Sequence, residues 1–90
     1  MLDQLRSMGV FACVVEKSSF SGAARDLGIT TSAVSQQIRS LEQEMEVTLL
    51  HRSTRKLSLT EAGQAFFYSC QEMLAAAERG KIRINEDRKS

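Results

Sequence analysis

Apolar residues recur every three or four positions in four segments of the chain, the spacing of a helix with one buried face. These segments are residues 3–17, a short helix that Ser21 can cap and Gly28 can end, residues 30–46, and residues 61–79. In the first of them, the stripe expected to face the core starts at Leu5. Residues 56–59 alternate polar and apolar side chains, as in a strand with one buried face, and Leu49 and Leu50 can supply a partner strand. The pattern predicts a mainly α fold: three helices, a two-stranded hairpin and a long last helix.

A tight turn joins the second and third predicted helices. Ala24 precedes Gly28 by four residues, so a small side chain lies where the two helices approach each other. Gly28 can adopt a left-handed conformation, which ends one helix and redirects the chain. Ile29 and Val34 are expected to return apolar groups to the core. A helix-turn-helix unit has this order, although an ordinary helical hairpin in a bundle could share the turn.

The outward face of the third predicted helix is polar and contains no acid before Glu42. Serine, threonine and glutamine side chains can bond base edges, and a helix N-terminus favours phosphate. The residues expected to read bases are Thr31, Ser32, Ser35 and Gln36. Those expected to contact the DNA backbone here are Ser21, Thr30 and Arg39, with Thr30 also a natural N-cap. The alternative is a solvated helix face, but such faces usually mix glutamate with lysine.

The hairpin that follows is basic. Between Val47 and Thr60 the charged residues are Arg52, Arg55 and Lys56, with no acidic residue among them. A basic wing can lie against phosphates or place an arginine in a minor groove, whereas a short basic run elsewhere is usually only a solvated surface. Because this run directly follows a helix-turn-helix pattern, we expect DNA contacts from all three residues.

The last predicted helix has an apolar stripe that is too long for a small core to cover. Thr60 is a suitable N-cap, and Gly80 with the polar residues after it predicts a fraying hinge. We therefore expect residues 1–60 to form the DNA-binding domain and residues 61–90 a dimerisation helix and hinge. The stripe residues expected to pack against a second copy of the chain are Phe66, Cys70, Met73 and Ala77.

These patterns together resemble the N-terminal DNA-binding domain of LysR-type transcriptional regulators. In the three predicted helices the matching residues are Leu5-Arg6 with Phe11, Ser19-Phe20-Ser21 with Ala23-Ala24 and Leu27, and Ser35 with Gln37-Ile38 and Leu41-Glu42. In the hairpin and the start of the last helix they are Leu49-Leu50-His51-Arg52 and Leu59-Thr60-Glu61-Ala62-Gly63. The resemblance implies a winged helix-turn-helix that binds dyad-symmetric promoter DNA as a dimer. It also implies a long fourth helix that dimerises and links to an effector-sensing domain, with higher oligomers where that domain is present.

The sequence departs from the family pattern at positions that matter for specificity. The family often has Gln-Pro where this chain has Thr31 and Ser32, and often arginine at Gln36. The operator sequence of other members therefore cannot be transferred. Leu50 replaces a usual phenylalanine, which should matter little. No counterpart of the sensing domain is expected in these 90 residues, so no small-molecule inducer should alter their DNA binding.

Composition agrees with one small domain in the cytoplasm. The formal net charge is only +1, so we expect moderate electrostatic binding that depends on dimerisation. No apolar run is long enough for a membrane span, and Asp3 and Arg6 argue against a signal peptide. Cys13 and Cys70 are isolated thiols without metal-ligand spacing, which favours a packing role in a reducing compartment.

Two other classes of function were weighed. An enzyme is not favoured, because the single histidine, His51, has no metal-spaced partner or nucleophile constellation, and no glycine-rich phosphate loop follows a strand. We expect no catalytic residue, metal or cofactor. A protein-binding helical dimer, similar to an antirepressor, could use the same apolar stripe, and it would bind no DNA duplex.

Overall fold

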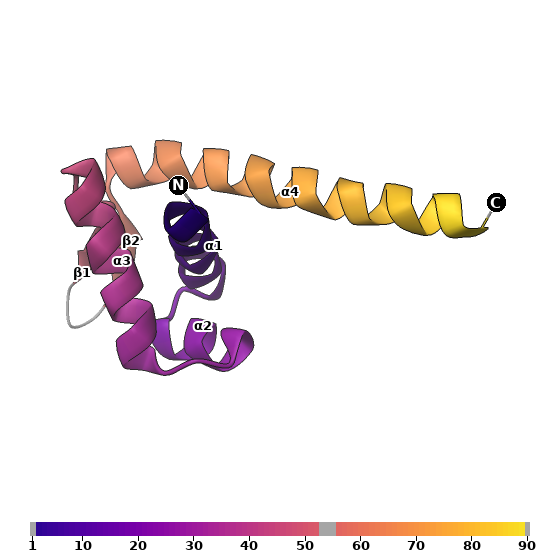
Figure 1. Cartoon of the computed structure of the whole chain (residues 1–90). Coiled ribbons are helices and arrows are strands. Elements are labelled where there is room, and N and C mark those ends of the chain that lie inside the picture. Colours follow the sequence, from indigo (N-terminus) through magenta and orange to yellow (C-terminus); the bar gives the residue numbers. More distant parts are fainter. Residues whose placement is uncertain (1, 53–55, 90) are drawn as a thin grey trace.

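The predicted architecture is confirmed by a computed structural model that describes residues 2–52 and 56–89 (Figure 1). The elements in chain order are α1 (Leu2–Lys17), α2 (Phe20–Leu27), α3 (Thr31–Met45), β1 (Leu50–Arg52), β2 (Leu57–Leu59) and α4 (Glu61–Lys89). Helices α1 to α3 form a compact group, the two strands lie beside it, and α4 crosses the group and projects beyond it. The fold is a winged helix-turn-helix followed by a long helix.

The core lies around α1, which packs against α2, α3 and α4. Phe11 is fully buried, and its ring lies 5.8 Å from that of Phe66 and 6.4 Å from that of Phe67. Val34, Ile38 and Leu41 of α3 complete the centre, as their spacing predicted, and Leu49, Leu50 and Cys70 close it from the other side.

Side-chain caps set the ends of α2 and α3. The Ser19 hydroxyl accepts a hydrogen bond from the Gly22 N–H at 3.0 Å, and the Thr30 hydroxyl accepts one from the Ala33 N–H at 3.0 Å. Gly28 ends α2 with a φ of 69°, as predicted. The expectation that Ser21 caps α2 was wrong, because the helix already begins at Phe20 and Ser19 takes that role.

Two apolar residues expected in the core are exposed instead. Ile29 is 37% exposed, because it continues the turn after Gly28: its N–H donates to the Ala24 carbonyl, and its side chain stays outside. Leu5, near the start of α1, is 39% exposed. The core-facing stripe of α1 therefore starts later than its spacing indicated.

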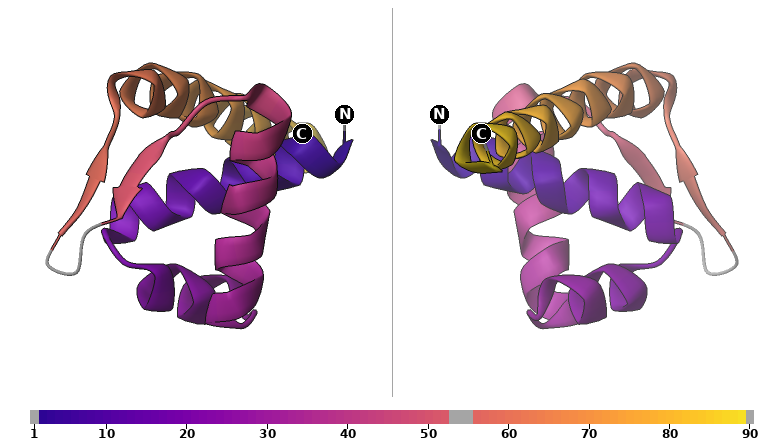
Figure 2. Two further views of the ribbon diagram at one scale, coloured as in Figure 1. Left: turned by 90° about the vertical axis from the view of Figure 1, so that its left-hand side faces the viewer. Right: turned by 90° about the vertical axis from the view of Figure 1, so that its right-hand side faces the viewer.

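The wing is a short antiparallel ribbon that stands beside α1 and α3 (Figure 2). Leu50 pairs with Leu59 and Arg52 pairs with Leu57. Leu57 and Leu59 are half-buried while Ser58 is exposed, which confirms the predicted alternation. The predicted tip of the hairpin, Ser53, Thr54 and Arg55, lies outside the described residues.

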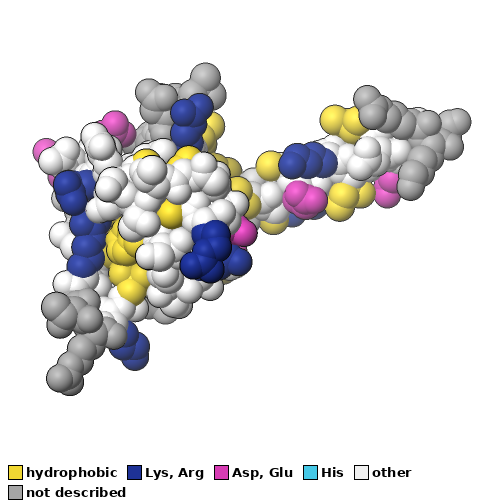
Figure 3. Space-filling model, turned by 90° about the horizontal axis from the view of Figure 1, so that it is seen from below, with side chains coloured by type: hydrophobic (Ala, Val, Ile, Leu, Met, Phe, Trp, Pro, Cys, Tyr) yellow, Lys and Arg dark blue, Asp and Glu magenta, His cyan; other side chains and the backbone are white. Residues whose placement is uncertain are grey.

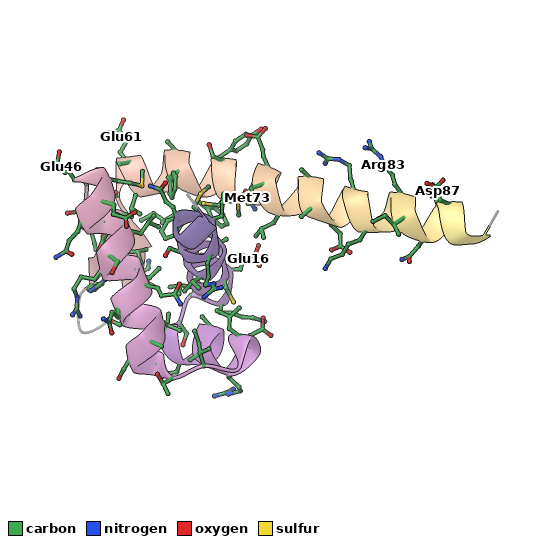
Figure 4. The ribbon with its side chains drawn as sticks, viewed as in Figure 1. Glu16, Glu46, Glu61, Met73, Arg83 and Asp87 are labelled. Atoms are coloured by element: carbon green, nitrogen blue, oxygen red, sulfur yellow. The ribbon has the colours of Figure 1, made fainter. Side chains whose placement is uncertain are left out.

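Helix α4 is longer than the sequence indicated. The Thr60 hydroxyl accepts a hydrogen bond from the Gly63 N–H at 2.9 Å, which confirms the predicted cap. The predicted hinge at Gly80 was wrong, because the helix continues to Lys89. One internal glycine costs only about 1 kcal/mol, which good helix formers around it offset. Arg83 and Asp87, one turn apart, point to the same side of the helix (Figure 4).

Candidate nucleic-acid interface

The four residues predicted to read bases share the outer face of α3. Thr31, Ser32 and Gln36 are exposed and Ser35 is half-buried, while the opposite face of the helix lies in the core. The helix therefore presents hydroxyl and amide groups to solvent without an acid among them. This is the geometry that a helix needs to enter a major groove.

The residues predicted to contact phosphates from α2 and α3 surround that face. Arg39 donates to the Ser35 hydroxyl at 3.3 Å, which holds its guanidinium along the outer side of α3. The Thr30 hydroxyl is used as an acceptor by its cap, so only its own proton remains to donate. Ser21 is exposed in the first turn of α2. Ser21, Thr30 and Arg39 are therefore exposed polar residues around the outer face of α3, and Thr30 is also the N-cap of that helix.

A shallow groove of about 460 Å³ between α1 and α3 adds a residue that the sequence did not single out for DNA. The side chains lining it include Arg6, Ser7, Gln36, Gln37 and Glu44. The Ser7 hydroxyl donates to Gln37 at 3.5 Å, which links α1 to the polar side of α3. Arg6 is exposed and lines the same groove as Gln36, which places a cation near the predicted readers. Only the fold could reveal this role of Arg6, because Arg6 and Gln36 lie thirty positions apart in the sequence and belong to different helices.

The wing differs from the freely basic hairpin expected. Arg52 forms an ion pair with Glu42 at 3.3 Å, and its guanidinium lies 5.4 Å from the centre of the Phe20 ring. Lys56 is exposed, and Arg55 lies outside the described residues. Arg52 thus already has partners within the chain, and its predicted contact with the DNA backbone stays a prediction.

Glu42 is a residue whose role sequence reasoning missed. Its carboxylate accepts hydrogen bonds from the Leu49 N–H at 2.7 Å and the Leu50 N–H at 3.3 Å, besides pairing with Arg52. The sequence showed only that Glu42 is the first acid after a polar face. Its partners lie seven to ten positions ahead, beyond helical spacing, so no local pattern could identify them.

Charge on the domain is distributed unevenly. Seen from below, basic side chains form a column along the edge that carries α3, and a further basic side chain lies beside the wing (Figure 3). Acidic side chains are also visible on this face, at the upper end of that column and on α4. A local basic edge can attract phosphates even though the net charge of the chain is only +1.

The predicted dimer surface on α4 needs one correction. Cys70 is fully buried within its own chain, so it is not available to a second copy. Phe66 is half-buried against Phe11, and Met73 is half-buried where α4 passes over α1 (Figure 4). Spacing alone could not separate stripe residues that α1 covers from those that it leaves open. From Leu74 to Asp87 every residue except Gly80 is exposed, including Ala77.

The two cysteines pack inside the domain, as predicted. Burial raises the pKa of the Cys70 thiol to about 11 from its ordinary 9.0. Burial and the nearby Asp26 carboxylate, 3.7 Å from the sulfur, also raise the pKa of the Cys13 thiol. Among the described residues, no cluster of three histidine, cysteine, aspartate or glutamate side chains could hold a metal ion. Within the same residues, no helix is long and apolar enough to cross a membrane.

These environments predict slow thiol chemistry in the folded protein. A Cys13→Ser variant isolates Cys70, whose thiolate fraction at pH 8 should be about 100-fold lower than in the unfolded chain. Reaction with an aromatic disulfide reagent, followed by absorbance, should therefore be slow until denaturant is added. Equal rates with and without denaturant would show that Cys70 is not packed in the core.

Comparison with known proteins gives the same picture. The profile of the family described as "Bacterial regulatory helix-turn-helix protein, lysR family" matches residues 5–64. The HTH-type transcriptional activator AaeR of Escherichia coli is 48% identical over 73 residues, 81% of this chain and 24% of that protein. The HTH-type transcriptional regulator CrgA of Neisseria meningitidis is 46% identical over 80 residues, 86% of this chain and 27% of that protein. The chain thus spans about a quarter of the length of these relatives.

Solved structures agree in fold as well. The DNA-binding domain of BenM in complex with catB site 1 DNA superposes with a TM-score of 0.84 at 32% identity, covering 91% of each chain. The DNA-binding domain of CbnR in complex with DNA gives a TM-score of 0.79 at 31% identity, covering 92% of this chain and 95% of that one. With the family profile matching two thirds of the sequence, this chain belongs to the lysR family of bacterial regulatory helix-turn-helix proteins.

Proposed function

We propose that this chain is the DNA-binding part of a transcriptional regulator and binds double-stranded promoter DNA at dyad-symmetric sites as a dimer. The observation that carries the proposal is the acid-free outer face of α3, which lies beside the wing on a fold shared with domains solved on DNA. In this proposal α3 lies in the major groove, and the wing follows the adjacent backbone or minor groove.

Base reading falls to Thr31, Ser32, Ser35 and Gln36. Backbone contacts come from Ser21, Thr30 and Arg39, from Lys56 on the wing, and from Arg55, which lies outside the described residues. The exposed guanidinium of Arg6 joins this set because it lines the same groove as Gln36. Each guanidinium or ammonium group neutralises a phosphate, so the affinity should fall as salt is added.

Dimerisation belongs to the part of α4 that the domain leaves uncovered. The stripe that faces α1 at Phe66 continues at Met73, Ala77 and Ile84, at intervals of seven, four and seven residues. Ile84 is 60% exposed in the single chain. A second copy of the chain would cover this stripe. In the proposed dimer interface, Ile84 replaces Cys70, which the sequence had suggested but which is buried. Residues 1–60 then read DNA and residues 61–90 join the two copies.

The alternatives are weaker on physical grounds. The relatives that match this chain bear the names of transcriptional regulators, not of enzymes. A purely protein-binding helical dimer has no use for an acid-free face on α3. Shift assays with random duplexes at two salt concentrations separate these functions, since a protein-binding module shifts none of them. We place the protein in the cytoplasm, where promoter DNA is accessible.

Random-site selection followed by a single substitution tests base reading. Gln36→Ala should weaken binding to the selected site by about 1–3 kcal/mol and relax preference at one base position in each half-site. Gln43→Ala is the matched control, because Gln43 is exposed on the same helix two turns further from the predicted readers. An unchanged motif at unchanged affinity for the Gln36 variant would remove Gln36 from the readers.

A further inference from the structure

The contacts of Glu42 join three parts of the DNA-binding face. Glu42 lies in the second half of α3, and its side chain is 17% exposed. One carboxylate oxygen accepts the Leu49 and Leu50 N–H groups at 2.7 and 3.3 Å, where the chain enters β1. The other oxygen pairs with Arg52 at 3.3 Å, at the end of the same strand. One side chain of the recognition helix therefore holds the first wing strand at both ends.

Arg52 extends this connection to α2. Its guanidinium lies 5.4 Å from the centre of the ring of Phe20, the first residue of α2. A cation over an aromatic ring is attracted to its face, so Arg52 is held between Glu42 and Phe20. These contacts leave little freedom for β1 to move relative to α3, since charged hydrogen bonds are stronger than neutral ones.

We propose that Glu42 and Arg52 are positioning residues that fix the wing relative to the recognition helix, so that both reach one DNA site together. This inference rests on the proposed DNA-binding function. A carboxylate close to a DNA-binding surface opposes phosphate by its charge. The ion pair with Arg52 neutralises the Glu42 carboxylate. The hydrogen bonds that this carboxylate accepts from Leu49 and Leu50 explain why an acid is kept at this position.

The proposal predicts an effect opposite in sign to simple electrostatics. Removing a negative charge near DNA should strengthen binding if charge alone matters. We expect Glu42→Ala to weaken binding about tenfold instead, as the loss of a charged hydrogen bond typically does. Glu42→Gln keeps an acceptor for the amides and loses only the ion pair, so it should fold and weaken binding less.

The measurement uses the 90-residue chain on a duplex obtained by random-site selection. Affinity is measured beside hydroxyl-radical footprints, which separate protection by the wing from protection by α3. Circular dichroism at the same temperature verifies that each variant is folded. Both Glu42 variants and Arg52→Ala should lose protection where the wing lies while keeping the base preference of each half-site. Glu16→Ala, which removes an exposed acid near the end of α1, is the control and should bind as tightly as wild type or more so.

The outcomes separate the two claims. A wild-type chain that shifts no duplex contradicts the proposed function itself. If wild type binds but folded Glu42→Ala binds equally or more tightly, the positioning role is overturned. If Arg52→Ala weakens binding while Glu42→Gln strengthens it, Arg52 is a direct phosphate contact instead. If a double variant with both Glu42→Ala and Arg52→Ala binds DNA no more weakly than Glu42→Ala alone, the two residues act through one shared contact.

Discussion

Gly63→Ala should destabilise the domain more than alanine at any other glycine of this chain. A Cβ atom at Gly63 would overlap the Leu49 carbonyl oxygen and approach its carbon to 2.9 Å. That carbonyl cannot retreat easily, because it accepts the Thr60 N–H at 3.0 Å and belongs to a fully buried residue. We expect a loss of about 3 kcal/mol, which for a domain of this size lowers the Tm by about 12–24 °C.

Gly80→Ala supplies the matched control in the same helix. A Cβ atom there meets nothing within 4 Å, and its backbone is already helical. Alanine should therefore stabilise α4 by up to about 1 kcal/mol. Thermal unfolding followed by circular dichroism compares the two variants at equal protein concentration. If both melt at the wild-type temperature, the start of α4 does not pack on Leu49 as closely as the structure shows.

The elements of the fold could be predicted because they rest on local patterns. Helical spacing in α1 and α3, the left-handed Gly28 and the cap at Thr30 are each determined within a few residues. The outer face of α3 followed directly, since the buried positions Val34 and Ile38 leave Ser35 and Gln36 on the other side. The presence of Gly63 was noted from its motif, but its contact with Leu49 was not.

What could not be predicted depends on contacts between separate elements. Glu42 holds a strand that begins eight positions later, and no repeat in the sequence links the two. Cys70 and Ala77 belong to the same stripe, yet Cys70 is fully buried in the core while Ala77 is exposed. Gly80 marks a possible helix end only if its neighbours are weak helix formers, and here they are not. Each error came from treating a local preference as decisive where packing determined the result.

Ile84→Glu should separate the dimer while leaving the DNA-binding domain folded. Ile84 is 60% exposed and directly follows Arg83, which Figure 4 shows on the part of α4 that projects beyond the domain, so a charge there should disturb little within the chain. In a two-fold dimer the change would place two like charges in an apolar interface. Met73→Glu is a poorer test, because Met73 is half-buried near α1 and a charge there would also disturb the domain.

Ile82→Glu is the control for this experiment. Ile82 is 49% exposed, and two residues along a helix place it about 160° around the axis from Ile84. The same charge on the opposite side should leave the dimer intact, as light scattering would show. Dissociation by Ile82→Glu alone would mean that the second copy covers the other face of α4.

The loss of the dimer should appear mainly in binding to full operators. Two recognition helices must lie about 34 Å apart to read both halves of an inverted repeat at once. When α4 no longer holds them, the second half-site is no longer bound at a high effective concentration. Affinity for the full site should then fall about 100-fold or more, while affinity for a single half-site changes little. An Ile84 variant that is monomeric by light scattering yet binds the full operator as tightly as wild type would contradict dimeric reading through α4.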